Sequence, residues 1–268
     1  MGPFLHPLDM LLDALARLPL AHAVLWVLAL NVAVFVAALV AGWAAGRLFA
    51  HRRVAPPPPP IGATELWLAL VCVLLNGAVA AAGLVLWRAG WIVLRSDEPL
   101  RVVRDLVVLF VVMDLGMYVT HRLAHHRLLF RVIHATHHRY DRPRPLTLFV
   151  LNPFEVLGFG ALWLAVLLVY PSSPLGMMLF LTLNVIFGVL GHLGVEPLPA
   201  AWLRLPLSRV LTTSTFHAVH HRDAEHNFGF YTLVWDRLLG TVSPDYLGTF
   251  ASAGRAGLAK DGAGDRTR

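Results

Sequence analysis

Of the 268 residues in the chain, 57% are hydrophobic and only 14% are charged. Soluble globular domains carry roughly 25% charged residues, so the chain is too apolar for that class. The formal charge of +6 comes from basic residues that flank apolar segments, as in membrane proteins, so we do not expect nucleic acid as a partner. The single cysteine, Cys72, excludes an internal disulfide framework.

Three apolar segments in the first half of the chain predict membrane helices. About 20 consecutive apolar residues cross the hydrocarbon core of a bilayer, and residues 24–46 contain no charged side chain. A run of prolines at 56–60 follows and predicts a stiff linker. The second segment is 66–87, and the third is 100–120, which carries arginines and aspartates.

The second half of the chain predicts an antiparallel pair of helices. Residues 156–195 contain no Asp, Glu, Lys or Arg. A capping residue stands directly before a proline at 152–153 and again at 173–174, which is typical of a helix N-terminus. We therefore expect one helix over 153–170 and a second from 174 to about 194.

The predicted fold class is all-α: a polytopic membrane bundle of about four to five membrane helices with a cytosolic, histidine-rich helical cap. Residues 1–63 form an N-terminal membrane helix and proline-rich linker, 64–248 the main membrane-embedded domain, and 249–268 a disordered tail. The arginine-rich loops fall on one side, which the positive-inside rule makes cytoplasmic. Because Lys260 is the only lysine among many arginines and alanines, we expect a bacterial inner membrane.

Eleven of the 14 histidines lie between residues 121 and 226, at helical spacings. An HxxxH pair begins at His121, and HxxHH triplets begin at His134 and His217. Residues at i, i+3 and i+4 share a helix face, so each triplet offers three imidazoles to one point. His126 lies about 140° round its helix from His121 and is expected not to be a ligand. His226 stays ambiguous.

This constellation indicates a metal site. Neutral imidazole is the commonest metal ligand, and it suits Fe, Zn, Cu and Ni. The clustered histidines together with His192 give nine donors, too many for one ion and about right for two, whereas a zinc site stops at three or four. Arg122 occupies the place of the glutamate that an HExxH metalloprotease needs.

The motifs also resemble those of a known family. The ordered runs DLGMYVTHRLAHH, HATHH, HLGVEPLP, FHAVHH and NFGFYTLVWDRLLGT, over about residues 105–242, are similar to the fatty acid hydroxylase superfamily, which includes sterol desaturases, C-4 sterol methyl oxidases and sphingolipid hydroxylases. The resemblance implies a membrane helical bundle whose cytosolic cap holds a di-metal centre. It also implies oxygen-dependent hydroxylation or desaturation of unactivated C–H bonds in lipids.

The resemblance assigns metal ligands and a closing signature. The implied ligands are His121, His125, His134, His137, His138, His192, His217, His220 and His221, and the implied signature is Trp235, Asp236, Arg237 and Gly240. Some members carry a further histidine where this chain has Glu196. Either Glu196 replaces that ligand, or Pro197 ends the helix and Glu196 points elsewhere, and we favour the second interpretation.

Several other residues are expected near the ligands. Asp114 and Tyr118 share a helical stripe with the first histidines, and Asp114 either accepts a hydrogen bond from a ligand's second nitrogen or pairs with an interfacial arginine. Glu155 is expected to cap a helix. The full set expected around the ligands, with turn or interfacial roles as the alternative for some, is Asp114, Tyr118, Glu196, Asp223, Asn227, Trp235 and Asp236.

The predicted function is a di-iron oxidoreductase with two Fe²⁺ ions as cofactor, O₂ as co-substrate and a lipid substrate from the bilayer. No catalytic residue beyond the ligands is required. An external donor of the ferredoxin or cytochrome b5 type must supply electrons, because the chain shows no heme, flavin or ferredoxin motif. A membrane metal transporter and a silent zinc-binding scaffold remain alternatives.

Overall fold

The computed structural model describes the backbone of residues 6–253 and the side-chain surroundings of residues 8–207 and 210–253. This part of the chain consists of helices, short helical turns and loops, which confirms the predicted all-α fold. The longer helices are α1 (His6–Arg17), α2 (Leu20–Leu48), α3 (Ala63–Arg88), α4 (Pro99–Ala124), α7 (Pro153–Val169) and α8 (Pro174–Gly191). The shorter ones are α5 (Phe130–Ile133), α6 (Ala135–His138), η1 (Pro145–Phe149), η2 (Ala200–Arg204), η3 (Pro206–Arg209), α9 (Ser214–Arg222), α10 (Val234–Leu238) and α11 (Tyr246–Ser252).

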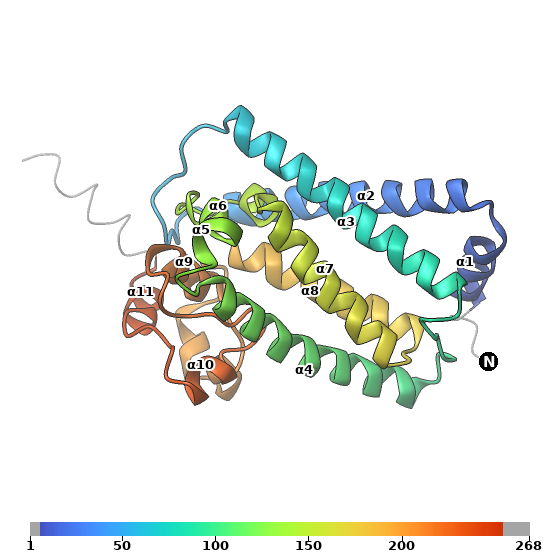
Figure 1. Ribbon diagram of the computed structural model, residues 1–268. Helices are drawn as coiled ribbons and strands as arrows, with labels where there is room; N and C mark the ends of the chain where they lie inside the picture. The colour runs from blue at the N-terminus through green and yellow to red at the C-terminus, as the bar shows by residue number, and fades with distance from the viewer. Residues whose placement is uncertain (1–5, 254–268) are drawn as a thin grey trace, which may run out of the picture.

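Five helices lie side by side and form the bundle (Figure 1). α2 packs against α3, α3 against α7, and α4 against both α7 and α8. Three of them, α2, α3 and α8, are long and apolar enough to cross a membrane, while α7 is apolar but has only 17 residues. α4 has 26 residues and carries charged side chains. The chain is therefore an integral membrane protein, as its composition predicted.

The buried acids near the start of α4 hold the α7–α8 hairpin in place. Asp105 accepts hydrogen bonds from the Tyr170 hydroxyl and from the backbone N–H of Ser173, both at 2.7 Å. Asp97 accepts from the N–H of Leu175 at 2.9 Å. These contacts satisfy backbone donors at the N-terminus of α8, which have no partner within the helix. The polar residues in the third apolar segment thus fix the turn that was predicted between the two helices.

The N-terminal segment is part of the same packed structure. The sequence did not predict α1, whose C-terminal carbonyls of Leu15 and Leu18 accept hydrogen bonds from Arg88 at the end of α3. α2 packs against α3, α8 and η1. At Gly42, an added Cβ would lie 2.6 Å from the Cβ of Pro145, so only glycine allows this close approach.

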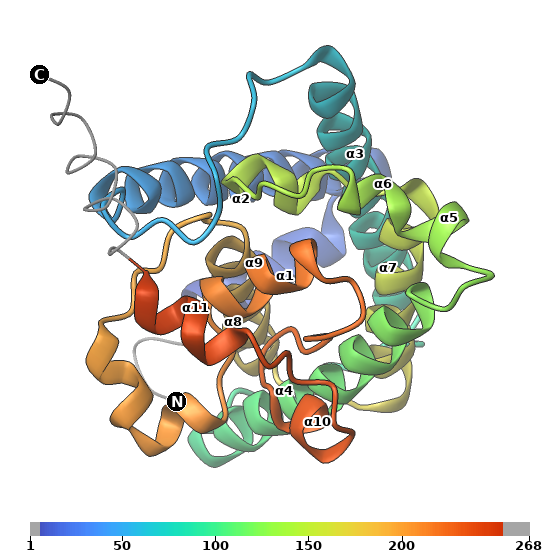
Figure 2. The same cartoon turned by 90° about the vertical axis from the view of Figure 1, so that its left-hand side faces the viewer.

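The short helices gather at one end of the bundle as a cap (Figures 1 and 2). Its apolar core contains Phe216, Leu233, Tyr246 and Phe250. Because Phe250 is buried there, residues 249–252 complete α11 instead of starting a disordered tail. The remainder of the predicted tail, from residue 254 on, lies outside the described residues.

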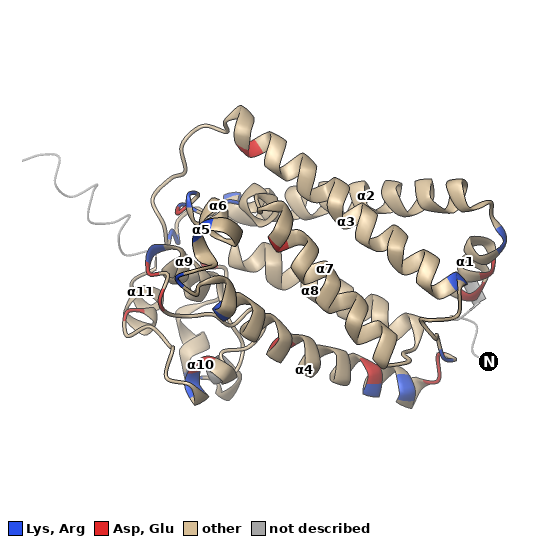
Figure 3. Cartoon of the chain, viewed as in Figure 1, with Lys and Arg blue, Asp and Glu red and all other residues tan. Residues whose placement is uncertain are grey.

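Charged residues are concentrated at the two ends of the bundle and are sparse between them (Figure 3). This distribution fits helices that cross a bilayer, because charges are costly in the hydrocarbon core. Arginines occur at both ends, as at Arg88 and Arg101 on one end and Arg127 and Arg144 on the other. The cytoplasmic placement of the cap therefore stays a prediction of the positive-inside rule.

Candidate metal centre

The structure brings all nine predicted histidines together at the junction of bundle and cap. They form two groups in which the candidate ligand atoms lie within 4.8 Å of one another. The first group, called group A, is His121, His125, His134, His138 and His220, and the second, called group B, is His137, His192, His217 and His221. The two groups adjoin, since the rings of His138 and His221 stack at 5.0 Å. The nine histidines expected from the sequence thus lie in two clusters of five and four candidate donors.

Each HxxHH triplet is divided between the groups, which differs from the expectation that it serves one point. In α9, the i and i+4 residues His217 and His221 belong to group B, while His220 belongs to group A. In the other triplet, His137 joins group B and its neighbours at 134 and 138 join group A. α6 and α9 therefore lie between the two groups, and each helix presents imidazoles to both.

Backbone carbonyls fix the orientation of four imidazoles. Nδ1 contacts a carbonyl oxygen in His121 (Phe228, 2.8 Å), His137 (Val150, 3.1 Å), His192 (Gly188, 2.8 Å) and His220 (His226, 2.6 Å). A carbonyl can only accept, so Nδ1 carries the proton and Nε2 carries a lone pair. Ligand histidines in metal sites are oriented by the same kind of contact.

The free lone pairs face one another. The Nε2 atoms of His137 and His192 lie 3.3 Å apart, and both rings have their Nδ1 proton on a carbonyl. The Nε2 atoms of His138 and His220 are 3.1 Å apart, and His220 is likewise fixed as an Nε2 acceptor. Opposed lone pairs repel unless a cation lies between them. The donor set therefore fits a metal ion in each group.

Burial keeps these imidazoles neutral. It lowers the pKa of His138 to about 3, an effect to which the neighbouring His121 adds. Burial also holds the pKa of His217, His220 and His221 well below the ordinary value. Neutral imidazole is the form that binds metals. The cluster is thus ready for a metal near neutral pH without first losing protons.

Glu155 was expected to cap a helix, but its side chain contacts a candidate ligand instead. Asn152 does cap α7, since its side chain accepts from the N–H of Phe154, but the carboxylate of Glu155 faces the metal centre. Its Oε1 lies 2.7 Å from Nδ1 of His134, and both side chains are buried. The angle is not that of a hydrogen bond, and Oε2 has no partner among the described residues. The contact still places a carboxylate behind a ligand of group A.

Asp236 supports the loop that holds His121. Its carboxylate accepts from the backbone N–H groups of Phe228 and Gly229 at 2.8 and 2.7 Å, and from the Thr241 hydroxyl. Phe228 in turn presents its carbonyl to His121. The hydroxyl of Tyr118 lies 3.0 Å from Thr241 Oγ1. Asp236 and Tyr118 thus act through the 228–241 segment and do not touch the metal groups.

Asp114 contacts neither a histidine nor an arginine, so both interpretations of it were wrong. Its carboxylate accepts from the N–H and hydroxyl of Thr232 and from Nε1 of Trp235 at 2.9 Å. Because these partners lie just before and within α10, Asp114 ties the closing signature to α4. Trp235 is consequently half-buried against the bundle.

Glu196 points away from the metal groups, as we favoured. Its Oε2 accepts from the N–H and hydroxyl of Thr215 at 2.9 and 2.7 Å, which satisfies donors in the first turn of α9. α8 ends at Gly191, well before Pro197. Glu196 therefore positions the helix that supplies three candidate ligands.

Two further residues fix the end of α9. Asn227, with a left-handed φ of 62°, donates to the carbonyl of Phe216 and accepts from the N–H of Ser243. Asp223 binds Nδ1 of His226 at 2.8 Å, and the carbonyl of His226 accepts from His220. His226 thus contributes a carbonyl rather than its imidazole. His126 is exposed and joins neither group, in agreement with the sequence analysis.

Comparison with known proteins identifies the family. A family model described as fatty acid hydroxylase matches residues 106–241, just over half of the chain. The chain belongs to the fatty acid hydroxylase family. The match begins within α4, runs past the end of α10 and includes all nine histidines of groups A and B.

Relatives within this family act on lipids, according to their names. The chain is 27% identical over 128 residues to a Delta(7)-sterol 5(6)-desaturase of Leptosphaeria maculans, covering 48% of this chain and 34% of that protein. It is 27% identical over 146 residues to the C-4 methylsterol oxidase erg25 of Schizosaccharomyces pombe, covering 53% and 48%. It is 30% identical over 131 residues to the very-long-chain aldehyde decarbonylase GL1-1 of Oryza sativa subsp. indica, covering 47% and 21%.

The chain spans between about a fifth and about half of the length of these curated relatives. No solved structure matches it.

Proposed function

We propose that this member of the fatty acid hydroxylase family is an oxygen-dependent di-iron membrane oxidoreductase. It hydroxylates or desaturates an unactivated C–H position of a lipid such as a fatty acyl chain or a sterol. The observation that carries the proposal is the pair of buried histidine groups with facing Nε2 atoms. The family and the named activities of its relatives support the same chemistry.

Groups A and B would each hold one iron ion. Bound iron supplies the one-electron and oxygen chemistry that opens a C–H bond. The chain holds the imidazoles in one tautomer, as the carbonyls of Phe228 and Gly188 do for His121 and His192. It also keeps water away, because most of the ligand side chains are buried. No acid or base from the protein is needed beyond these roles.

The substrate and the electrons would approach from different sides. The helices of the bundle are apolar and lipid-facing, so a lipid reaches the junction with the cap from the bilayer. The cap is exposed at the end of the bundle (Figure 2), where a ferredoxin- or cytochrome b5-type donor can dock. In this proposal the cap lies on the cytoplasmic side, as predicted from the arginine-rich loops, and the membrane is a bacterial inner membrane, as predicted from composition.

The test is lipid mass spectrometry of a host with and without the chain. We expect an oxygen-dependent product that differs by about +16 mass units for hydroxylation or about −2 for desaturation. His137→Ala and His220→Ala remove one ligand from each group and should abolish the product. His126→Ala is the matched control and should leave it unchanged. Full product formation by the iron-free chain would refute the proposal.

A membrane metal transporter is the main alternative. Transporters place polar ligands near the middle of the membrane, between broken helices. Here α6 and α9, which carry five of the nine histidines, lie at one end of the bundle (Figure 1). Metal uptake into vesicles without turnover of any lipid would favour the transporter. Tight zinc binding without oxygen consumption would favour a silent scaffold.

A further inference from the structure

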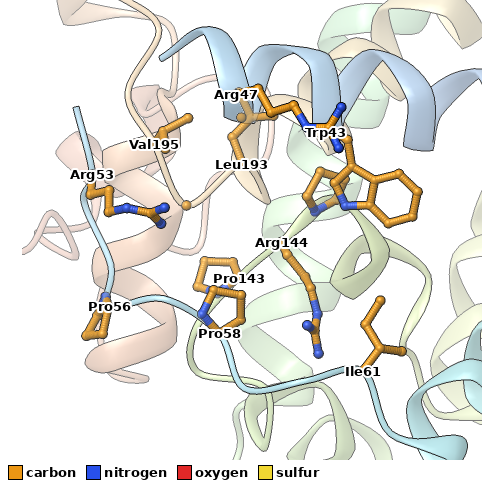
Figure 4. Close-up of a pocket in the computed structure, with 13 residues that line it drawn as sticks. Trp43, Arg47, Arg53, Pro56, Pro58, Ile61, Pro143, Arg144, Leu193 and Val195 are labelled. Atoms are coloured by element: carbon orange, nitrogen blue, oxygen red, sulfur yellow. The ribbon is translucent and has the colours of Figure 1, made fainter. Parts of the chain in front are cut away.

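A cavity of about 470 Å³ lies at the C-terminal end of α2, and its volume is within the size range of small-molecule sites. Its lining comes from the end of α2, the proline-rich linker, the 143–145 loop and the segment that follows His192. The lining residues are Trp43, Gly46, Arg47, Arg53, Pro56, Pro58, Ile61, Pro143, Arg144, Pro145, Leu193, Gly194 and Val195. Figure 4 shows these side chains around a common space. Nothing in the proposed reaction uses this cavity.

The walls of the cavity are held by specific contacts. The N–H of Val54 donates to the carbonyl of Gly194 at 3.2 Å, and the N–H of Glu196 donates to the carbonyl of Arg52 at 2.8 Å. These bonds pair the start of the linker with the chain after His192. Arg144 donates to the carbonyl of Pro59 at 2.7 Å. These hydrogen bonds therefore hold the linker in place as one wall of the cavity.

The charges of the cavity are positive and only partly neutralised. Arg144 forms an ion pair with the buried Glu65 of α3, so its charge is already matched. Arg47 and Arg53 have no ion pair with a carboxylate in the described part of the chain. No acidic side chain lines the cavity. Two guanidinium groups are thus available for an anion, and arginine binds phosphate and carboxylate oxygens in a bidentate manner.

Apolar surface adjoins these two arginines. Trp43 stands one helical turn before Arg47 on α2, and residues four apart share a helix face. Trp43 and Ile61 are both exposed, and Trp43 suits the membrane interface. In Figure 4, Arg47 lies beside Trp43 and Arg53 reaches in from the linker. A ligand in this cavity meets positive charge and apolar contacts together.

We propose that this cavity binds the anionic headgroup of a lipid, with Arg47 and Arg53 on the anion and Trp43 and Ile61 on the first part of the tail. Basic pockets beside membrane helices suit such headgroups. Leu193, which lines the cavity, directly follows His192 of group B in the chain, so the segment that forms part of the cavity wall also carries a candidate ligand. The proposal names a substrate class for the proposed lipid oxidoreductase and rests on that function.

The test is calorimetric titration of the full chain in a non-ionic detergent with dioctanoyl phosphatidylglycerol. Dioctanoyl phosphatidylcholine and inorganic phosphate are the comparison ligands. We expect both to bind at least roughly tenfold more weakly than phosphatidylglycerol, since the site needs the net anion and the tail together. Equal binding of phosphatidylcholine, or of inorganic phosphate, would overturn the assignment to an anionic lipid.

Variants locate the site. Arg47→Gln combined with Arg53→Gln should weaken phosphatidylglycerol binding roughly tenfold, and Trp43→Ala should weaken it without changing the preference for the anion. Arg127→Gln combined with Arg131→Gln removes two exposed arginines at the same end of the bundle, outside the cavity, and should have no effect. Binding that is unchanged in the first variant, or weakened equally in the control, would overturn the proposal.

The titration is carried out without turnover, so it separates the two proposals. Unchanged binding in the Arg47/Arg53 variant refutes the headgroup site even if a lipid product forms. A host that forms no oxidised lipid refutes the proposed function even if phosphatidylglycerol binds in the cavity. No histidine of groups A or B lines the cavity, and unchanged melting temperatures of the variants will show that they fold.

Discussion

At the scale of single residues, spacing located the histidines but not the groups around them. Imidazoles at i, i+3 and i+4 are costly to bury without a purpose, so the spacing singled out eight positions, and His192 was added to them as an isolated histidine. The partners that orient them are mostly backbone carbonyls, such as those of Phe228 and Val150, and no sequence pattern marks a carbonyl. Glu155 was assigned to a helix start because "NPFE" fits a capping sequence, and only the packing of α7 against α5 turns it toward His134.

Glu155 should strengthen metal binding through His134. Replacing the carboxylate by an amide in Glu155→Gln keeps the shape of the side chain but removes the acidic group that lies 2.7 Å from Nδ1 of His134. Loss of such a partner costs 10–100-fold in metal affinity or activity by the usual magnitude, and we expect roughly a tenfold loss of iron affinity in competition with a chelator. Glu225→Gln, at an exposed position, is the control. Rescue of iron affinity and of the iron absorption spectrum by Glu155→Asp would show that the carboxylate orients the His134 imidazole. Unchanged iron affinity in Glu155→Gln would contradict this role.

At the scale of helices, the sequence predicted where helices begin, but it did not predict how the histidines of each triplet are divided between groups A and B. Both cap-then-proline signals begin helices as predicted, at Pro153 and Pro174. The division of each triplet between two groups depends on α6 and α9 lying between them, and this arrangement comes from contacts across the chain. α1 was missed because its 12 residues include charged side chains and form a short amphipathic helix rather than an apolar span.

Glu196 should stabilise α9 and, through it, both groups. In Glu196→Ala, the N–H and hydroxyl of Thr215 lose a buried acceptor, which costs about 1–3 kcal/mol in the free energy of unfolding. We expect a lower melting temperature, with reduced iron content as its consequence. Thermal unfolding followed by circular dichroism measures the change. Asp223→Ala, beyond the other end of the same helix and half-exposed, should cost less; an equal or larger loss there would contradict the role of Glu196.

At the scale of the whole molecule, composition and hydropathy predicted a membrane bundle with a histidine-rich cap, and the structure confirms this fold. What they could not show is that α2 and the proline-rich linker complete the cap end, since pairing of residues 52–54 with residues 194–196 is a long-range contact. The histidines of groups A and B come from the C-terminal ends of α4 and α8 of the bundle and from α6, α9 and the residue before α6 at the cap end.

The metal-free chain should be sensitive to acid. Above pH of about 6.5, a histidine such as His138 is neutral in both the folded and the unfolded chain. The pKa of His138 in the folded chain is about 3. As the pH falls from about 6.5 toward this value, His138 becomes protonated in the unfolded chain but stays neutral in the folded chain. The free energy of unfolding therefore decreases over this range. Melting temperatures of the chelator-treated chain at pH 7.5 and pH 5 measure this decrease. The control variant His126→Ala should show the same difference between the two pH values. Equal melting temperatures at both pH values would contradict the prediction.

The stoichiometry of iron tests the central claim most directly. We expect two iron ions per chain in protein purified without oxygen, measured by mass spectrometry of the metal. His220→Ala in group A and His217→Ala in group B should each lower the iron content toward one per chain, while His126→Ala retains two. A single iron ion per chain, zinc in its place, or loss of iron on removal of His126 would contradict a di-iron centre built from these two groups.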